Sequence, residues 1–124
     1  MTDYYDEIKD LQAKQSQLEE DYLNEERRVK QVQETMDQTK QQLHQSFYEI
    51  LEDTLAVIGD EDDDLRQQAV RNFEQSDQEL SETYRKSANE VQEEWDDFQV
   101  KNKQSRQELS DQITELKGKE SSDG

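Results

Sequence analysis

Apolar residues recur at steps of three or four residues, or at sums of these steps, through two long segments of the chain. One segment runs from Tyr4 to Ile50 and the other from Val70 to Leu116. Such spacing gathers the apolar side chains into one stripe along a helix, as in the seam of a heptad pattern. The chain has no proline, and its glycines at 59, 118 and 124 all lie outside the two segments. The sequence therefore predicts two long helices.

The predicted seam is mostly apolar. It consists of Tyr4, Ile8, Leu11, Leu18, Tyr22, Val29, Val32, Met36, Leu43, Phe47 and Ile50, and then of Val70, Phe73, Leu80, Tyr84, Ala88, Val91, Trp95, Phe98, Leu109 and Leu116. Polar residues interrupt it at Gln15, Glu25, Thr39, Asp77, Asn102 and Ser105. A polar seam residue lowers stability but helps to fix register and the choice of partner. We therefore expect a marginally stable structure that gains stability on binding.

Composition separates this interpretation from intrinsic disorder. Only 28% of the residues are apolar, 39% are charged and the formal net charge is -18. Low hydrophobicity with high net charge is typical of disordered chains. Disordered chains are also rich in proline and glycine, whereas this one is rich in Gln, Glu, Lys, Arg and Leu, which favour helix. The balance favours long solvated helices whose only apolar surface is a seam.

The turn is predicted at Gly59–Asp63, because glycine after a periodic segment commonly ends a helix and the following acids favour a helix start. A short connection favours antiparallel neighbours. The predicted fold is all-α, a long antiparallel two-helix hairpin that resembles a coiled coil. Residues 1–117 form this single domain, with helices at about 3–58 and 62–117, and residues 118–124 form a disordered tail.

A fold centred on this turn also predicts which residues face each other. Phe47 should lie near Phe73, and Tyr22 near Phe98. Met36 should lie near Tyr84 and Ala88. Large apolar residues thus meet one another, which favours the hairpin over a single uninterrupted helix.

Several classes of function are disfavoured. Acids outnumber bases 33 to 15, which opposes binding to nucleic acid and to anionic membranes. The longest apolar run, residues 55–58, is far shorter than the ~20 residues that a membrane helix needs, so no membrane insertion is expected. The N-terminal MTDYYDEIKD has no basic and apolar regions typical of a cleavable signal peptide.

No metal, cofactor or catalytic site is expected. Asp60, Asp62 and Asp64 resemble the start of an EF-hand loop, but Leu65 and Arg71 occupy the positions that need glycine and glutamate. The chain has no cysteine and a single histidine, at position 44, which we expect to be solvated or partly packed. Two paired helices offer no convergent polar site for catalysis, so we expect a protein that is not an enzyme.

The segment 47–58 is apolar on more than one helical face. A single partner helix covers only one stripe, so this segment indicates a surface for another protein or for a second copy. The predicted partner-binding residues here are Phe47, Tyr48, Leu51, Leu55, Val57 and Ile58, together with Phe73 on the second helix. The alternative is a wider hairpin core near the turn, completed by Leu65, Ala69, Val70 and Phe73.

Trp95 and Phe98 are the other predicted partner-binding residues. They share one helical face with Val91. The opposing level of the first helix, near Glu25 and Arg27, is polar. This mismatch indicates a third helix at Trp95, because tryptophan is often an interface anchor. The alternative is an ordinary seam position.

In length, acidity, lack of cysteine and hairpin pattern, the chain resembles the small helical accessory proteins found beside LXG-domain toxins of bacterial type VII secretion. They are relatives of the WxG-type hairpins. The turn Ile58-Gly59-Asp60 has the glycine of the WxG signature but no tryptophan, and Phe73 to Asp77 matches a Phe-x-x-x-Asp pattern. The resemblance implies a cytoplasmic bacterial protein, with export alongside its partner as a further alternative.

The expected function is that of an adaptor or chaperone. The resemblance implies packing against the helical domain of an LXG toxin, with a second small helical protein as a further partner, to stabilise the toxin or target it for export. A self-associating structural coiled-coil spacer, which would be a homo-oligomer, is the alternative. No export role is assigned to the Phe73–Asp77 pattern.

Overall fold

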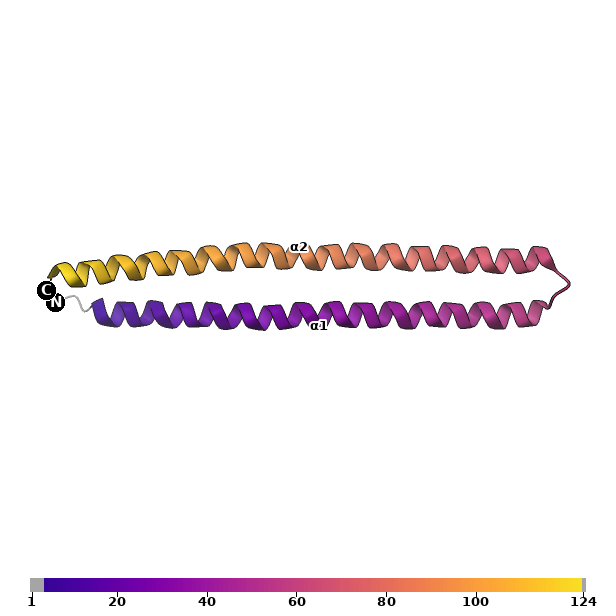
Figure 1. Cartoon of the computed structure of the whole chain (residues 1–124), viewed down its shortest axis with the longest axis horizontal. Helices are drawn as coiled ribbons and strands as arrows, with labels where there is room; N and C mark the ends of the chain where they lie inside the picture. Colours follow the sequence, from indigo (N-terminus) through magenta and orange to yellow (C-terminus); the bar gives the residue numbers. More distant parts are fainter. Residues whose placement is uncertain (1–3, 124) are drawn as a thin grey trace. The chain divides into compact units, whose positions relative to one another are not determined.

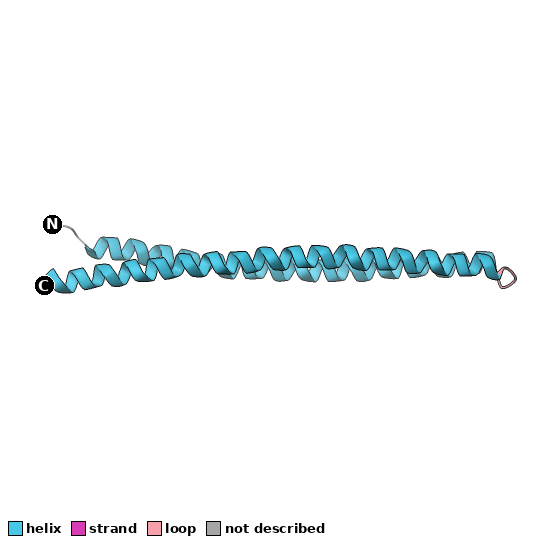
Figure 2. Ribbon diagram, turned by 90° about the horizontal axis from the view of Figure 1, so that it is seen from above, coloured by secondary structure: helices cyan, strands magenta, loops and turns pink. Residues whose placement is uncertain are grey.

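The computed structural model describes residues 4–123, and these form two antiparallel helices (Figure 1). Helix α1 spans Tyr4–Ile58 and helix α2 spans Asp63–Asp123. Figure 2 shows helix throughout the described residues except at the connection between α1 and α2. The predicted all-α hairpin, with its turn near Gly59–Asp63, is therefore confirmed.

The chain divides into two compact units. The terminal unit comprises Met1–Lys30 and Glu93–Gly124, and the turn unit comprises Gln31–Gln92. In each unit a segment of α1 packs against a segment of α2, and the two segments run in opposite directions (Figure 1). The turn unit lies entirely within the described residues.

Gly59 ends α1. Its φ of 77° lies in the left-handed region, and its amide donates a hydrogen bond to the carbonyl of Leu55 at 3.0 Å. Three residues later, the Asp62 carboxylate accepts a hydrogen bond from the amide of Leu65 at 3.1 Å, which caps the start of α2. Both ends of the turn therefore satisfy backbone groups that a helix leaves free.

Arg66 joins the two sides of the turn. Its Nη1 donates to the carbonyls of Leu55 at 3.1 Å and of Gly59 at 2.8 Å. Leu55 lies in the last turn of α1 and Gly59 directly follows that helix, so the cation also complements the helix dipole. A side chain at the start of α2 thus closes the end of α1.

The most completely buried side chains belong to the terminal unit. They are Ile8, Val29, Ile113 and Asn102. In the turn unit, all of which is described, apolar seam residues stay partly exposed. The terminal unit therefore holds the better-formed core, and the turn unit leaves more apolar surface in contact with solvent.

The observed seam departs from the prediction at several positions. Leu43, Ile50 and Ala88 were expected at the seam but are exposed, whereas Ile113 was not expected and is buried. The contacting residues near the turn are Phe47, Leu51, Leu55 and Ile58, and those near the chain's end are Ser105, Leu109, Ile113 and Leu116. Both sets advance by four, four and three residues, a step of 11 residues that shifts the stripe away from a strict heptad.

The predicted end of the second helix is corrected. Helix α2 continues through Gly118 to Asp123, and Gly124 lies outside the described residues. Gly118 has no positive φ, and the Ser122 hydroxyl donates to its carbonyl at 3.0 Å. A single glycine costs a helix only about 1 kcal/mol, so the helix continues past it.

Candidate protein-interaction surface

The segment 47–58 divides into a seam and an outward face. Phe47, Leu51, Leu55 and Ile58 are half-buried. The first three line clefts together with residues of α2. They are partner-binding residues by prediction, and the structure uses them to join α1 to α2. The alternative of a wider core near the turn therefore accounts for part of the segment's apolar character.

The outward face is an apolar stripe at heptad spacing, formed by Leu43, Ile50 and Val57, which we call the outer stripe. Ile50 is 61% exposed and Val57 is 88% exposed. Residues seven apart lie on one face of a helix, so these side chains form a row beside the seam. Of the predicted residues, Val57 belongs to this row. Ile50 and Leu43 were assigned to the seam, because the sequence spacing did not reveal where the stripe shifts.

A groove lies between the outer stripe and α2. Its volume is about 350 Å³, and its lining consists of Phe47, Ile50, Leu51, Thr54, Ala69, Asn72, Phe73 and Ser76. The lining from α1 is mostly apolar, and α2 contributes small or polar residues around Phe73. On α2, Leu65 is 48% exposed and lies one turn before Ala69. Apolar side chains thus lie along both helices beside one groove.

Phe73 is the aromatic centre of this surface. Tyr48 meets its ring edge-on at a centroid distance of 6.2 Å, and the His44 ring lies 5.9 Å away. His44 Nδ1 in turn lies 2.5 Å from Asp77 Oδ1, which joins α1 to α2. His44 was expected to be solvated or partly packed; its side chain is 51% exposed and lies beside the Phe73 ring, but its pairing with Asp77 was not foreseen. Asp77 was interpreted only as an interruption of the seam.

Trp95 and Phe98 lie in the terminal unit, and both are half-buried. Their rings are stacked at 5.8 Å, and Tyr22 of α1 lies 5.3 Å from Trp95. The predicted polar mismatch at Trp95 is therefore wrong, because Tyr22 supplies the aromatic partner. Tyr22 was expected near Phe98, one turn away. A partner-binding role for Trp95 and Phe98 stays a prediction, without the mismatch that motivated it.

Polar groups accompany this aromatic cluster. Gln99 Nε2 donates to the Tyr22 hydroxyl at 3.1 Å, and the Arg106 guanidinium lies 6.0 Å from the Tyr22 ring centroid.

Glu25, one turn after Tyr22, forms an ion pair with Arg28. The Arg28 guanidinium donates to the Glu25 carboxylate and holds the pKa of that carboxyl below its usual value, against the opposing effect of burial. The pKa of Arg28 is raised by the same hydrogen bond. These interactions stabilise the terminal unit and form no convergent site.

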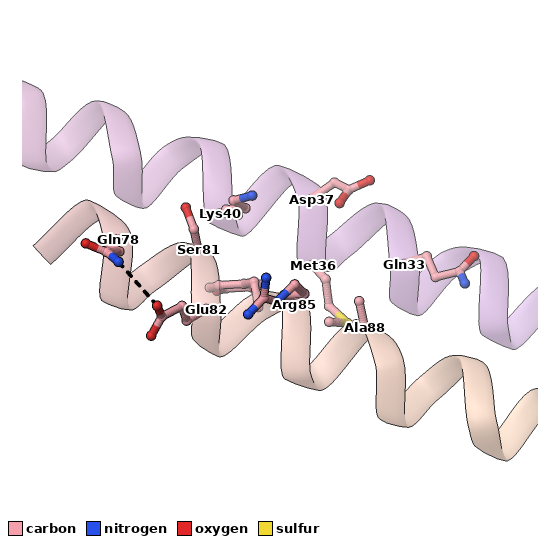
Figure 3. Close-up of a pocket in the computed structure, with 10 residues that line it drawn as sticks. Gln33, Met36, Asp37, Lys40, Gln78, Ser81, Glu82, Arg85 and Ala88 are labelled. Atoms are coloured by element: carbon pink, nitrogen blue, oxygen red, sulfur yellow. Dashed lines mark hydrogen bonds between the residues drawn. The ribbon is translucent and has the colours of Figure 1, made fainter. Parts of the chain in front are cut away.

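A second cleft in the turn unit is mixed in polarity (Figure 3). Figure 3 shows Met36 of α1 directed towards Ala88 of α2, and Tyr84 lines the same cleft, in agreement with the predicted pairing. Lys40 and Arg85 also line the cleft. Flexible charged side chains surround the single contact made by the methionine. We therefore expect the cleft to hold water rather than a tightly bound ligand.

Among the side chains that the structure describes, no group of three or more His, Cys, Asp or Glu is arranged to hold a metal ion. Over residues 4–123, neither helix has a stretch apolar and long enough to cross a bilayer.

No protein-family profile, curated protein or solved structure matches the chain. Function is therefore inferred from the chain's own residues and their arrangement. The outer stripe and its groove are the strongest candidate, because large exposed apolar surfaces mark sites of protein interaction.

Proposed function

We propose that the chain is a protein-binding adaptor whose turn unit packs against an α-helical partner. The observation that carries this proposal is the outer stripe, with Ile50 61% and Val57 88% exposed beside an open groove. Burying apolar surface contributes about 25 cal/mol per Å², so covering this stripe favours association. No catalytic step is part of the proposed role.

The resemblance to type VII accessory hairpins makes an LXG-domain toxin the proposed partner. Its long helical domain would supply the helix that covers the turn unit. The adaptor would then stabilise the toxin in the bacterial cytoplasm or target it for export, with a second small helical protein completing the complex. Co-export with the toxin is part of the same proposal.

The test is co-expression with the product of the neighbouring gene, which the proposal expects to be an LXG-domain protein. We expect the two proteins to co-purify and the Ile50→Asp variant to lose the partner. Leu23→Asp is the matched control, because Leu23 is exposed to a similar degree, 54%, but belongs to the terminal unit. Circular dichroism would establish that both variants stay helical. The proposal fails if wild type and both variants bind equally or if none binds.

Sedimentation equilibrium on the isolated chain addresses the alternative of a self-associating spacer. The adaptor proposal predicts a weakly stable monomer that becomes more resistant to unfolding with its partner. A homo-oligomer of high thermal stability that does not bind the LXG-domain protein would favour the spacer alternative and contradict the adaptor proposal.

A further inference from the structure

We propose that the groove beside the outer stripe takes a basic amphipathic helix from the partner. This inference rests on the proposed function and adds the chemical character of the partner segment. The lining of the groove is uncharged, whereas the clefts around Met36 and Val70 are each lined by both acids and bases.

The turn unit is strongly acidic. Residues 31–92 contain 15 Asp and Glu against 5 Lys and Arg, a formal charge of -10. An acidic surface attracts a partner of positive charge and repels one of negative charge. The groove therefore opens on a surface that favours a basic ligand.

Few of the bases in this unit lie at the groove. Lys40 and Arg85 line the cleft of Figure 3. Arg66 and Arg71 line a different cleft with Val70, and Arg66 is also bonded to the end of α1. The groove lining itself contains no Lys or Arg and no Asp or Glu. Lys86, the fifth base of the unit, lies ten residues beyond Ser76, the last lining residue along α2.

Acids lie at helical spacing from the exposed apolar residues. Asp53 is three residues after Ile50 and four before Val57, so it shares their side of α1. On α2, Glu79 is three residues after Ser76, so it lies on the same side of that helix. The surface thus combines an apolar stripe with acids on both helices.

This combination matches a helix with apolar residues on one face and Lys or Arg beside them. An apolar stripe at positions i, i+3 or i+4 and i+7 fits a groove between two helices. Basic residues flanking that stripe would pair with the acids, as flanking charges do in coiled coils. A second copy of this chain fits less well, because its own turn unit would add a further formal charge of -10 to the interface.

The test uses three fluorescent peptides with the wild-type protein. One is an amphipathic helix with Lys beside its apolar stripe. The second has the same stripe with Glu in place of Lys. The third contains the residues of the Lys peptide in an order that destroys the stripe. Fluorescence anisotropy at low and at physiological ionic strength gives each affinity and its dependence on salt.

We expect the Lys peptide to bind at least about tenfold more tightly than the other two, with an affinity that falls as salt rises. Ile50→Asp should weaken it by about tenfold or more, and Leu23→Asp should leave it unchanged. Replacing the acids together, as Asp53→Asn with Glu79→Gln, should reduce the dependence on salt. These results would support the proposal.

Equal binding of the Lys and Glu peptides, or of the Lys peptide and its scrambled form, would overturn the proposal. So would a homodimer that forms in sedimentation equilibrium and is lost on Ile50→Asp. The proposed function would survive such results if the LXG-domain protein still bound wild type and not Ile50→Asp. Failure of that co-purification would instead reject the adaptor role itself.

Discussion

The side-chain amide of Asn102 donates a hydrogen bond to the carbonyl oxygen of Leu18 at 3.0 Å, across α2 and α1 of the terminal unit. Asn102 is only 6% exposed, so this is a buried polar contact within an otherwise largely apolar seam. A buried asparagine of this kind can select one register at a cost in stability. We infer that Asn102 holds the pairing of the helices in the terminal unit.

Replacing Asn102 with leucine tests that role. The carbonyl of Leu18 lies within α1 and can keep its helical hydrogen bond, so no buried group is left unsatisfied. We expect Asn102→Leu to raise the free energy of unfolding by about 1 kcal/mol and to allow additional oligomeric states. Urea unfolding and sedimentation velocity measure the two effects. A less stable variant with a single oligomeric state would contradict the assigned role.

The two described glycines should respond oppositely to alanine. Gly59 has φ 77°, which an L side chain adopts only with strain, although no atom beyond its two chain neighbours lies within 4 Å of the place that an alanine methyl group would take. Gly59→Ala should therefore lower the free energy of unfolding by about 1 kcal/mol. Gly118 is helical and equally open, so Gly118→Ala should raise it by about 0.5 kcal/mol. Urea unfolding followed by circular dichroism measures both changes. Changes of the same sign in the two variants would refute this account of the turn.

Arg66 should contribute more to stability than Arg71, which lies five residues later on the same helix. Arg66→Met removes the hydrogen bonds to the carbonyls of Leu55 and Gly59 and should cost about 1 kcal/mol, allowing for its partial exposure. Arg71→Met removes only a long, exposed contact to Gln67 at 3.4 Å and should change stability little. Hydrogen exchange at the turn amides should accelerate in the first variant alone. Equal exchange in both variants would show that Arg66 does not close the turn.

The Glu25–Arg28 pair predicts a local pH dependence. The hydrogen bond from Arg28 holds the folded-state pKa of Glu25 below the ordinary value of 4.5. Stability from this pair is therefore present above pH 4.5 and is lost as the pH falls through the folded-state pKa. Arg28→Gln should return the pKa of Glu25 towards 4.5, as measured by NMR titration of its carboxyl carbon. Lys30→Gln should leave the pKa of Glu25 unchanged, and an unchanged value in Arg28→Gln would contradict the assignment.

Much of the fold follows from the sequence. The apolar spacing predicts both helices, and Gly59 followed by acids predicts the turn, because these signals are local. The length of α2 was underestimated since Gly118 was interpreted as a helix end, whereas a helix tolerates one glycine when its neighbours keep their hydrogen bonds.

The candidate surface was predicted less completely. The segment 47–58 was identified correctly as apolar on several faces, but spacing did not show which residues would face α2. That division depends on the 11-residue step from Phe47 to Ile58, which turns Ile50 outwards. Similarly, the contact between Tyr22 and Trp95 depends on register between distant segments, and a shift of one turn changes the partner.

Hydrogen–deuterium exchange on the chain, alone and in complex with the proposed LXG-domain partner, tests the central claim most directly. The account predicts that binding slows amide exchange in 43–58 and 65–76, on both sides of the groove, and that residues around Trp95 change less. Protection confined to the terminal unit, or no protection at all in a complex that has formed, would contradict the assignment of the turn unit as the docking surface.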